Sequence, residues 1–471
     1  MDIEEFKARG HQLVEWMADY FQKIDRFPVK SRVRPGEILK QLPLRPPEEP
    51  ESFDALFADF LSVVLPGMTH WQSPSFFAYF NANNSFPSIL AEMITATLGA
   101  QCMSWQTSPA ATELEERVME WLRELIGLPD GFTGVIQDTA STATLCSLLT
   151  AREKHSGYRI NRTGLGPEKF TVYCSEHGHS SIDKAVRIAG IGSDQLRKVR
   201  TGDDFALIPT VLEETIDRDV KAGFTPLAVV AALGTTSSAA IDPLAEVGRI
   251  CRDRGIWYHV DAAYAGTALL VEENRWMIRG IEDVDTLVFN PHKWMFTNFD
   301  CSAYFVRDPR ALIHTFTILP EYLRTREGEE VKNYRDWGIQ LGRRFRALKL
   351  WFVIRSFGAR GLREKVRAHM EWAGRLAAEI KSEDDFELLA PPSLGVLCFR
   401  HHPDDLADEP DLTRWNRRLM ETLNDTGRIY LTHTKLAGRF TLRLVVGQTY
   451  QREEHVRRGW ELIKNSARSL A

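Results

Sequence analysis

Apolar residues near the start of the chain recur every three or four positions, which is the spacing of an amphipathic helix. This pattern extends over residues 3–24, where the sequence offers no core of its own to cover the apolar stripe. Residues 28–50 are rich in proline and predict an extended or turn-rich connection. Residues 53–64 predict a second helix, so the first part of the chain is expected to be helical and to pack against another surface.

The middle of the chain alternates helical stretches with short apolar runs. The runs cover residues 171–174, 227–233, 256–260, 286–289 and 302–306. Alternation of strands and helices predicts an α/β fold with a mainly parallel sheet.

The last part of the chain has a different order of predicted elements. A long helix is expected from Ala347 to about Lys381, with a break near Gly358 and Gly361. Short strand candidates follow at 395–399 and 440–446, and a final helix is expected from Glu453. This order predicts a smaller α+β domain.

Composition and charge narrow the class of protein. Among 471 residues, 44% are apolar and 26% charged, as in ordinary soluble globular proteins. The net charge of −5 gives no overall basic field for nucleic acid, and no apolar run approaches the ~20 residues of a membrane helix. The N-terminus lacks a signal-peptide layout. Six scattered cysteines without C-x-x-C or metal-ligand spacing predict reduced thiols, no metal site and a cytoplasmic location.

Chemically suggestive residues follow the apolar runs, and open α/β sheets bind ligands outside the carboxyl ends of their strands. The first four runs are each followed by such residues, in order His179, Thr236, Asp261, and Asn290 with His292 and Lys293. A buried lysine with a lowered pKa is a nucleophilic amine that can form a Schiff base. A buried carboxylate can pair with a pyridinium nitrogen. Lys293 and Asp261 together therefore suggest pyridoxal phosphate.

Residues 134–145 add a helix start rich in hydroxyl groups, with Thr139, Ala140 and Ser141 at its beginning. Free N–H groups and the positive end of the helix dipole suit a phosphate, although an ordinary serine or threonine cap has the same pattern.

Taken singly, these residues also have structural readings: Lys293 as a surface charge, Asp261 as a loop cap and His179 as a hydrogen-bonded structural histidine. The combination in this order favours the cofactor. The sequence has no G-x-G-x-x-G of a nicotinamide enzyme and no G-x-x-x-x-G-K-[ST] of a P-loop enzyme. A non-catalytic scaffold would not need these residues at strand ends.

The chain resembles the pyridoxal-phosphate-dependent group II decarboxylases, in particular the branch of the aromatic-L-amino-acid decarboxylases. The resemblance covers nearly the whole chain and rests on residues 73–80 (SPSFFAYF), 108–115 (SPAATELE), 134–145, 179–181 (HSS), 234–236 (GTT), 260–266 (VDAAYAG), 290–294 (NPHKW) and 341–346 (LGRRFR). It implies a fold type I homodimer, with an N-terminal helical dimerisation segment (1–78), a large cofactor domain (79–350) and a small C-terminal domain (351–471). The neighbouring subunit would supply part of the active site, around 101–103 and Gly342.

By the same resemblance, Lys293 forms the Schiff base, Asp261 keeps the pyridine nitrogen protonated and His179 stacks on the ring. Tyr322, in a charged segment expected to act as a lid, would protonate Cα after carbon dioxide leaves. The residues that would surround the phosphate and the ring are Thr139, Ala140, Ser141, Thr236, Asn290 and His292. Relatives that produce aldehydes oxidatively tend to replace the lid tyrosine or the stacking histidine. This chain retains both, which favours simple decarboxylation over the aldehyde synthase alternative.

The stretch 70–80 is rich in aromatic residues, some of which are expected in the core and others against an aromatic substrate. It has no arginine or lysine for an acidic substrate. Asn81-Ala82 replaces the Pro-Thr of animal relatives, and Gln101 and Met103 replace isoleucine and phenylalanine. The residues expected to bind substrate are Trp71, Tyr79, Phe80, Ala82, Gln101, Met103 and Gly342. A broad aromatic range is expected, with tryptophan, phenylalanine, tyrosine and dopa as candidates and a non-aromatic amino acid as the alternative.

Overall fold

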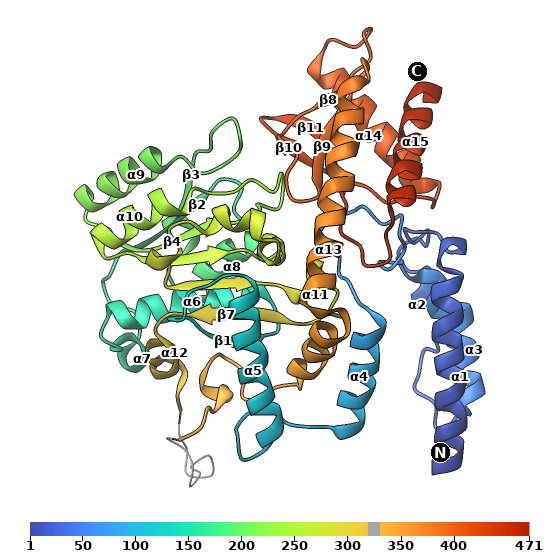
Figure 1. The fold of residues 1–471 in the computed structure, drawn as a ribbon, viewed down its shortest axis with the longest axis horizontal. Coiled ribbons are helices and arrows are strands. Elements are labelled where there is room, and N and C mark those ends of the chain that lie inside the picture. Colours follow the sequence, from blue (N-terminus) through green and yellow to red (C-terminus); the bar gives the residue numbers. More distant parts are fainter. Residues whose placement is uncertain (319–329, 471) are drawn as a thin grey trace. The chain divides into compact units, whose positions relative to one another are not determined.

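The computed structural model describes residues 1–318 and 330–470, which form two compact units. The first unit joins residues 1–81 with 378–387 and 399–471, and the second contains 82–377 and 388–398. Figure 1 shows the elements of both along the chain. The division into 1–78, 79–350 and 351–471 stays a prediction.

The second unit is built on a seven-stranded sheet in the order β1-β7-β6-β5-β4-β2-β3. Its strands are β1 (Thr133–Gln137), β2 (Phe170–Ser175), β3 (Leu196–Val199), β4 (Thr225–Ala232), β5 (Trp257–Asp261), β6 (Thr286–Phe289) and β7 (Ser302–Val306). Only β7 runs antiparallel to its two neighbours in this sheet. The prediction of a mainly parallel α/β sheet is confirmed.

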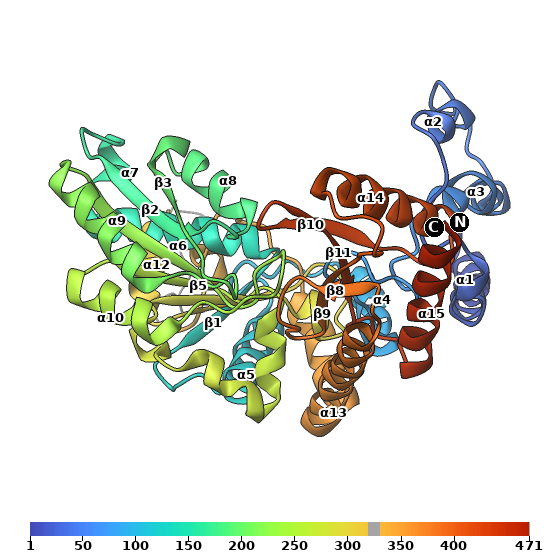
Figure 2. The ribbon, with the colours of Figure 1, turned by 90° about the horizontal axis from the view of Figure 1, so that it is seen from above.

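Helices cover both faces of this sheet (Figure 2). The helices of this unit are α4 (Phe86–Leu98), α5 (Pro109–Leu125), α6 (Ala140–His155), α7 (Ile160–Thr163), α8 (Ser180–Ile188), α9 (Pro209–Lys221), α10 (Leu244–Arg254), α11 (Pro291–Trp294), α12 (Pro309–Phe316) and most of α13 (Arg346–Ser382), although α4 and α13 are not among those that lie on the sheet. Val135 of β1 faces α6 in the core, whereas a Cβ at the next-door Gly134 would lie 2.3 Å from Met119 of α5. The glycine thus lets α5 lie close against the sheet.

The first unit contains the N-terminal helices α1 (Ile3–Gln22), α2 (Glu37–Gln41) and α3 (Phe53–Asp59). The C-terminal region contributes two helices and a four-stranded sheet in the order β10-β11-β9-β8. These elements are β8 (Phe386–Leu388), β9 (Val396–His401), α14 (Glu409–Asp425), β10 (Thr432–Leu436), β11 (Arg439–Val445) and α15 (Glu453–Leu470). Helix α1 has no buried residue, and Ile3, Phe6 and Val14 are exposed. The predicted uncovered apolar stripe is therefore present.

Two further findings concern long helices. Gly358 has φ +65° within α13, so the predicted break is confirmed at this residue. Across residues 1–318 and 330–470, none of the helices combines the length and apolar character needed to cross a bilayer.

Candidate functional site

Lys293 lies in the one-turn helix α11, directly after β6. Asn290 follows the strand and caps α11, and its carbonyl accepts the backbone N–H of Lys293 at 2.9 Å. The side-chain amide of Asn83 donates to the Lys293 carbonyl at 2.5 Å. The lysine is half-buried at the carboxyl edge of the sheet, and its backbone is fixed from two sides.

Asp261 and His179 lie at the ends of neighbouring segments at the same edge. Asp261 is the last residue of β5, is 9% exposed, and accepts the N–H of Ala263 at 3.0 Å. His179 caps α8, with Nδ1 accepting the N–H of Ser181 at 3.1 Å. Loss of water around the ring lowers the pKa of His179, while the charge of Asp261 raises it and that of Lys293 lowers it. The structure thus brings these three predicted residues into electrostatic reach of one another.

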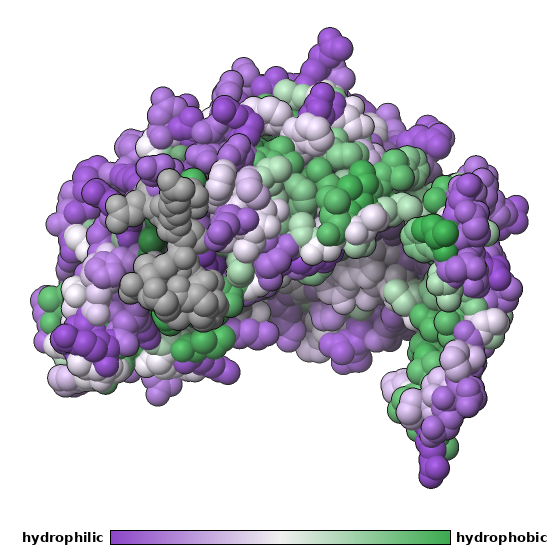
Figure 3. Space-filling view, turned by 90° about the horizontal axis from the view of Figure 1, so that it is seen from below, coloured by the Kyte–Doolittle hydropathy of each residue, from purple (hydrophilic) through white to green (hydrophobic). Residues whose placement is uncertain are grey.

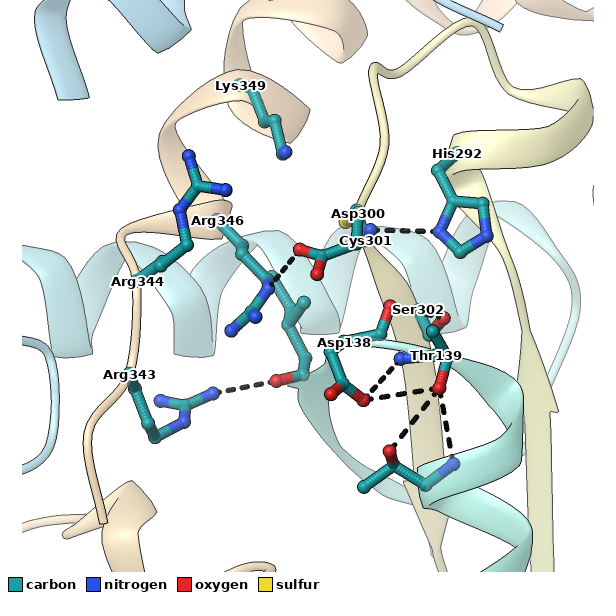
Figure 4. A network of polar contacts seen from close by, with 12 residues as sticks. Asp138, Thr139, His292, Asp300, Cys301, Ser302, Arg343, Arg344, Arg346 and Lys349 are labelled. Atoms are coloured by element: carbon teal, nitrogen blue, oxygen red, sulfur yellow. Dashed lines mark hydrogen bonds and ion pairs between the residues drawn. The ribbon is translucent and has the colours of Figure 1, made fainter. Parts of the chain in front are cut away.

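His292, next to the lysine, is held as a neutral donor. Burial, followed by the charge of Lys293, lowers the pKa of His292 to about 3. Its Nδ1 accepts the backbone N–H of Cys301 at 2.9 Å (Figure 4). Because that nitrogen is the acceptor, the ring proton of the neutral form lies on Nε2, which is a hydrogen-bond donor.

Helix α6 begins with the hydroxyl-rich segment. The Thr139 side chain accepts the N–H of Thr142 at 3.4 Å and so caps the helix. Ala140 and Ser141 follow in the first turn, where backbone N–H groups have no acceptor within the helix. Within residues 1–318 and 330–470, no group accepts a hydrogen bond from these two N–H groups. This is the arrangement that suits a phosphate.

Asp138 precedes this cap and is anionic. Burial alone would raise the pKa of Asp138, but hydrogen bonds from Thr142, Gln340 and Thr139, with the charge of Arg346, lower it. The Gln340 amide donates to the Asp138 carboxylate at 2.7 Å. The carboxylate is thereby occupied by its own partners, shown in part in Figure 4, and is less able to repel an anion at the helix start.

Ser302, the first residue of β7, links two parts of the site. Its hydroxyl lies 2.7 Å from Asn290 Oδ1 and 3.2 Å from the carbonyl oxygen of Asp138. The hydroxyl therefore ties the end of β6 to the end of β1, next to the lysine and next to the helix start.

Behind the lysine, Trp294 is held by an aromatic pair and a histidine. Its ring stacks on Tyr264 with centroids 4.6 Å apart and an angle of 1°. Its indole N–H donates to Nδ1 of the buried His369 at 3.0 Å. Because burial lowers the pKa of His369 to about 3, this acceptor stays neutral and available.

Thr236 lies in the loop after β4 and is exposed, while its neighbours hold the loop in shape. Thr235 Oγ1 lies 3.2 Å from Ser238 Oγ, and the buried Asp242 accepts the N–H of Ala232 at 2.8 Å. Burial raises the pKa of Asp242 to about 6. These contacts hold the loop at the carboxyl edge of β4.

Several predicted substrate residues meet in the second unit. Gln101 Oε1 accepts the backbone N–H of Arg343 at 2.7 Å, and a Cβ at Gly342 would lie 3.2 Å from Gln101 Nε2. The Met103 carbonyl accepts the N–H of Arg335 at 2.8 Å, and Ala82 lies beside Asn83 in the sequence. Gln101 and Gly342 are therefore neighbours, and Met103, two residues after Gln101, is bound to Arg335.

The other predicted substrate residues lie in the first unit. Trp71 stacks on the buried Phe76 at 4.4 Å and on Tyr79 at 5.8 Å. Tyr79 is 48% exposed, and Arg443 lies 4.5 Å from the centre of the Phe80 ring. The expectation that part of this aromatic stretch is core is met by Trp71 and Phe76. Tyr322 lies outside the described residues.

Sequence reasoning missed Asn83, Ser302 and His369. Asn83 had a signal, because it follows the Asn81-Ala82 departure directly. Ser302 begins an apolar run whose direction in the sheet the sequence does not give. His369 lies within a long helix with no pattern that distinguishes it from a surface histidine.

The donor set fits pyridoxal phosphate. Lys293 supplies a primary amine, and Asp261 supplies a buried carboxylate for a pyridinium nitrogen. The α6 start and the neutral His292 supply hydrogen-bond donors for a phosphate. The site thus contains an amine, a carboxylate and neutral donors, which are the kinds of group that this cofactor needs.

Comparison with known proteins agrees with this chemistry. The family model described as the pyridoxal-dependent decarboxylase conserved domain matches residues 35–402. Tyrosine decarboxylase 1 of Narcissus pseudonarcissus is 41% identical over all of this chain and 94% of its own length. Phenylacetaldehyde synthase of Arabidopsis thaliana is also 41% identical, over all of this chain and 97% of its own length. A crystal structure of Oryza sativa TDC with PLP and tryptamine has a TM-score of 0.97 and 36% identity, covering 100% of this chain and 99% of that chain.

Proposed function

The chain belongs to the pyridoxal-dependent decarboxylase family, and from this premise we propose that it converts aromatic L-amino acids to the corresponding amines and carbon dioxide. The observation that carries the proposal is that Lys293, Asp261 and His179 all lie at the carboxyl edge of one sheet, after β6, at the end of β5 and after β2. Tyrosine decarboxylase from Narcissus, at 41% identity, supports an aromatic substrate.

We propose that each of these groups has one task in holding the cofactor. Lys293 binds it covalently through its amine, Asp261 pairs with the ring nitrogen and His179 covers the ring face. The bound cofactor supplies an electron sink for the pair released when the Cα–carboxylate bond breaks. Thr236 lies at the same edge and contributes to the wall beside the ring.

The phosphate is proposed to lie between α6 and α11. The backbone N–H groups of Ala140 and Ser141, the Thr139 hydroxyl and Nε2–H of His292 are the donors. Asn290 accepts a hydrogen bond from Ser302, which also bonds to Asp138, so the starts of α11 and α6 are held side by side.

Substrate selection is assigned to the aromatic stretch and to the residues around Gln101. Trp71, Tyr79 and Phe80 would supply flat apolar surface, and Ala82 lacks a hydroxyl that would favour a catechol. Gln101 is fixed by Arg343, and Gly342 leaves the space next to its amide open. Met103 is adaptable in shape and suits a broad range of rings.

A second candidate, oxidative conversion to an aromatic aldehyde, is favoured by one observation. The Arabidopsis phenylacetaldehyde synthase is as similar to this chain as the Narcissus decarboxylase. That reaction consumes dioxygen and water and releases aldehyde, carbon dioxide, ammonia and hydrogen peroxide. Retention of Tyr322 and His179 supports the amine as product instead.

The deciding experiment measures products from tryptophan, phenylalanine, tyrosine, dopa, glutamate and histidine with purified protein loaded with pyridoxal phosphate. Amine in proportion to carbon dioxide, without hydrogen peroxide, is expected from the aromatic substrates. Aldehyde with equimolar peroxide would establish the second function. Turnover confined to glutamate or histidine would refute the aromatic assignment.

A homodimer is proposed from the exposed apolar face of α4. Phe86, Leu90, Ile94 and Leu98 recur at helical spacing and are 54%, 52%, 41% and 60% exposed. Such a stripe on a helix marks an interaction surface. Figure 3 shows hydrophobic residues gathered over a broad part of one molecular face.

Glutamates in place of Leu90 and Ile94 are expected to give monomers in sedimentation velocity. The matched control replaces Ile188 and Val220, which are 67% and 52% exposed on other helices, and is expected to remain dimeric. A dimer that survives the first pair of changes would contradict the proposed interface. The supply of Gln101, Met103 and Gly342 by the neighbouring subunit stays part of this proposal.

A cytoplasmic location is likewise proposed. All six cysteines are free and buried. Reduced thiols without disulfides fit a reducing compartment.

A further inference from the structure

A hollow of about 370 Å³ lies in the first unit and is lined by four arginines. Arg26 and Arg32 come from the segment after α1, Arg428 from the loop after α14, and Arg458 from α15. Asp25 is the one acidic residue in the lining, so the formal charge of the hollow is +3. Lys293 and the other residues assigned to the cofactor belong to the second unit.

The arginines have little compensation from carboxylates. Among described residues, no carboxylate lies within 4.0 Å of Arg26 or Arg428. Arg458 reaches Asp25 only at 4.0 Å. Arg32 donates to the carbonyl of Thr426 at 2.5 Å, which positions the guanidinium without neutralising it. Like charges gathered in a concave site attract a counter-ion of matching charge.

The walls of the hollow are joined by backbone hydrogen bonds. The Val29 N–H donates to the Gly427 carbonyl at 2.8 Å, and the His70 N–H donates to the Val29 carbonyl at 2.9 Å. Three segments distant in sequence therefore form one scaffold. Gly427 has φ +67°, and a Cβ there would lie 2.5 Å from an Arg32 nitrogen, so glycine permits the close approach.

The floor adds hydroxyl donors. Ser73, which is 1% exposed, and Ser75 both line the hollow. Ser73 Oγ accepts the N–H of Ser75 at 3.3 Å, which leaves its own O–H to donate. The guanidinium groups and the hydroxyls of Ser73 and Ser75 are hydrogen-bond donors that suit an oxyanion.

We propose that the arginine hollow, defined by Arg26, Arg32, Arg428 and Arg458, binds a compact phosphate polyanion of about three negative charges. The tetrahedral oxygens of a diphosphate point in several directions, so guanidinium groups from opposite walls each find a partner. The volume has room for a further group on the diphosphate, since small-molecule sites begin at about 300 Å³. This site is separate in residues and in chemistry from the decarboxylation proposed above.

Calorimetric titration of the cofactor-loaded enzyme at low salt tests the site with three probes. Inorganic pyrophosphate and ADP are expected to bind, and tricarballylate, a tricarboxylate of similar charge, is expected to bind at least about tenfold more weakly. Tighter binding of ADP than of pyrophosphate would show that the organic group contributes. Equal binding of the two would show that the phosphates alone are recognised.

Glutamine at both Arg26 and Arg428 is expected to weaken pyrophosphate binding at least about tenfold, since each removes a charged donor. Asparagine at Asp25 is expected to strengthen it, because a repulsive charge is removed. The control places glutamine at Arg249 and Arg360, two exposed arginines of the second unit, and is expected to change affinity less than about twofold. Absence of pyrophosphate binding, tricarballylate binding as tight as pyrophosphate, or equal weakening in the control would overturn the proposal.

Discussion

Glutamine in place of Glu115 removes the charge that pairs with the buried Arg343. Glu115 Oε1 lies 2.6 Å from the guanidinium and accepts the N–H of Ile136 at 2.8 Å, and the two side chains are 3% and 6% exposed. Removing one partner of such a pair costs about 3–5 kcal/mol, because a buried charge is left uncompensated. Glutamine keeps a hydrogen-bond acceptor, so the lower end of that range, about 3 kcal/mol, is expected.

The matching change in melting temperature follows from the size of the second unit. Its roughly 300 residues give an unfolding entropy of about 0.6 kcal/mol/K, so about 3 kcal/mol corresponds to about 5 °C. Calorimetric melting at saturating pyridoxal phosphate and fixed protein concentration measures this shift. Because the Arg343 N–H holds Gln101, a higher KM for aromatic substrate is expected alongside it.

Glu116 provides the matched control. It pairs with Lys332 at 2.6 Å, but the two side chains are 38% and 28% exposed, so Glu116→Gln should cost less than about 1 kcal/mol. The double change Glu115→Leu with Arg343→Leu should be milder than the sum of the single changes, since no unpaired charge remains. A shift below about 1 °C for Glu115→Gln, or equal to that of Glu116→Gln, would refute the reasoning.

Further predictions concern the lysine, the lid and the buried histidines. Lys293→Ala should abolish turnover and the visible cofactor band that borohydride bleaches; residual turnover would remove the covalent assignment. Tyr322→Phe should move product from amine toward aldehyde and hydrogen peroxide, and an unchanged amine yield would exclude Tyr322 as the key proton donor. Burial lowers the pKa of His259 to about 4, and burial together with nearby positive charge lowers those of His292 and His369 to about 3. The unfolded chain therefore binds more protons below pH 6.5, and each histidine should remove about 2 kcal/mol of stability between pH 7 and pH 5. In His369→Phe this pH dependence should be smaller by about that amount in denaturant titrations; an unchanged dependence would contradict the low folded pKa.

The strands that carry the site were predictable because they are continuously apolar. The 286–289 and 302–306 runs coincide with β6 and β7, and 256–260 differs from β5 by one residue at each end. Strands buried on both faces have this composition in parallel sheets. By contrast, β3 (Leu196–Val199) was missed because its two middle residues, Arg197 and Lys198, are charged, as an edge strand allows.

The pattern of apolar residues could not predict the direction of a strand in the sheet. An apolar run reads the same for either direction, so nothing indicated that β7 is antiparallel. This reversal brings the first residue of β7, Ser302, to the edge where the other strands end. The sequence also could not show which ring nitrogen of His292 carries the proton. The choice depends on a hydrogen bond from the backbone N–H of Cys301, nine positions away.

The first unit is made of segments from both ends of the chain, and this affects how the protein folds during translation. It joins residues 1–81 to residues after 377, whereas the second unit is almost continuous from 82 to 377. Because domains generally fold as units while the chain emerges, the second unit has nearly all of its residues before the first unit does. Helix α1, whose apolar stripe stays exposed even in the folded chain, is then without the rest of its unit for most of translation. We therefore expect the N-terminal helices, rather than the catalytic sheet, to be the segment of the nascent chain that most needs a chaperone.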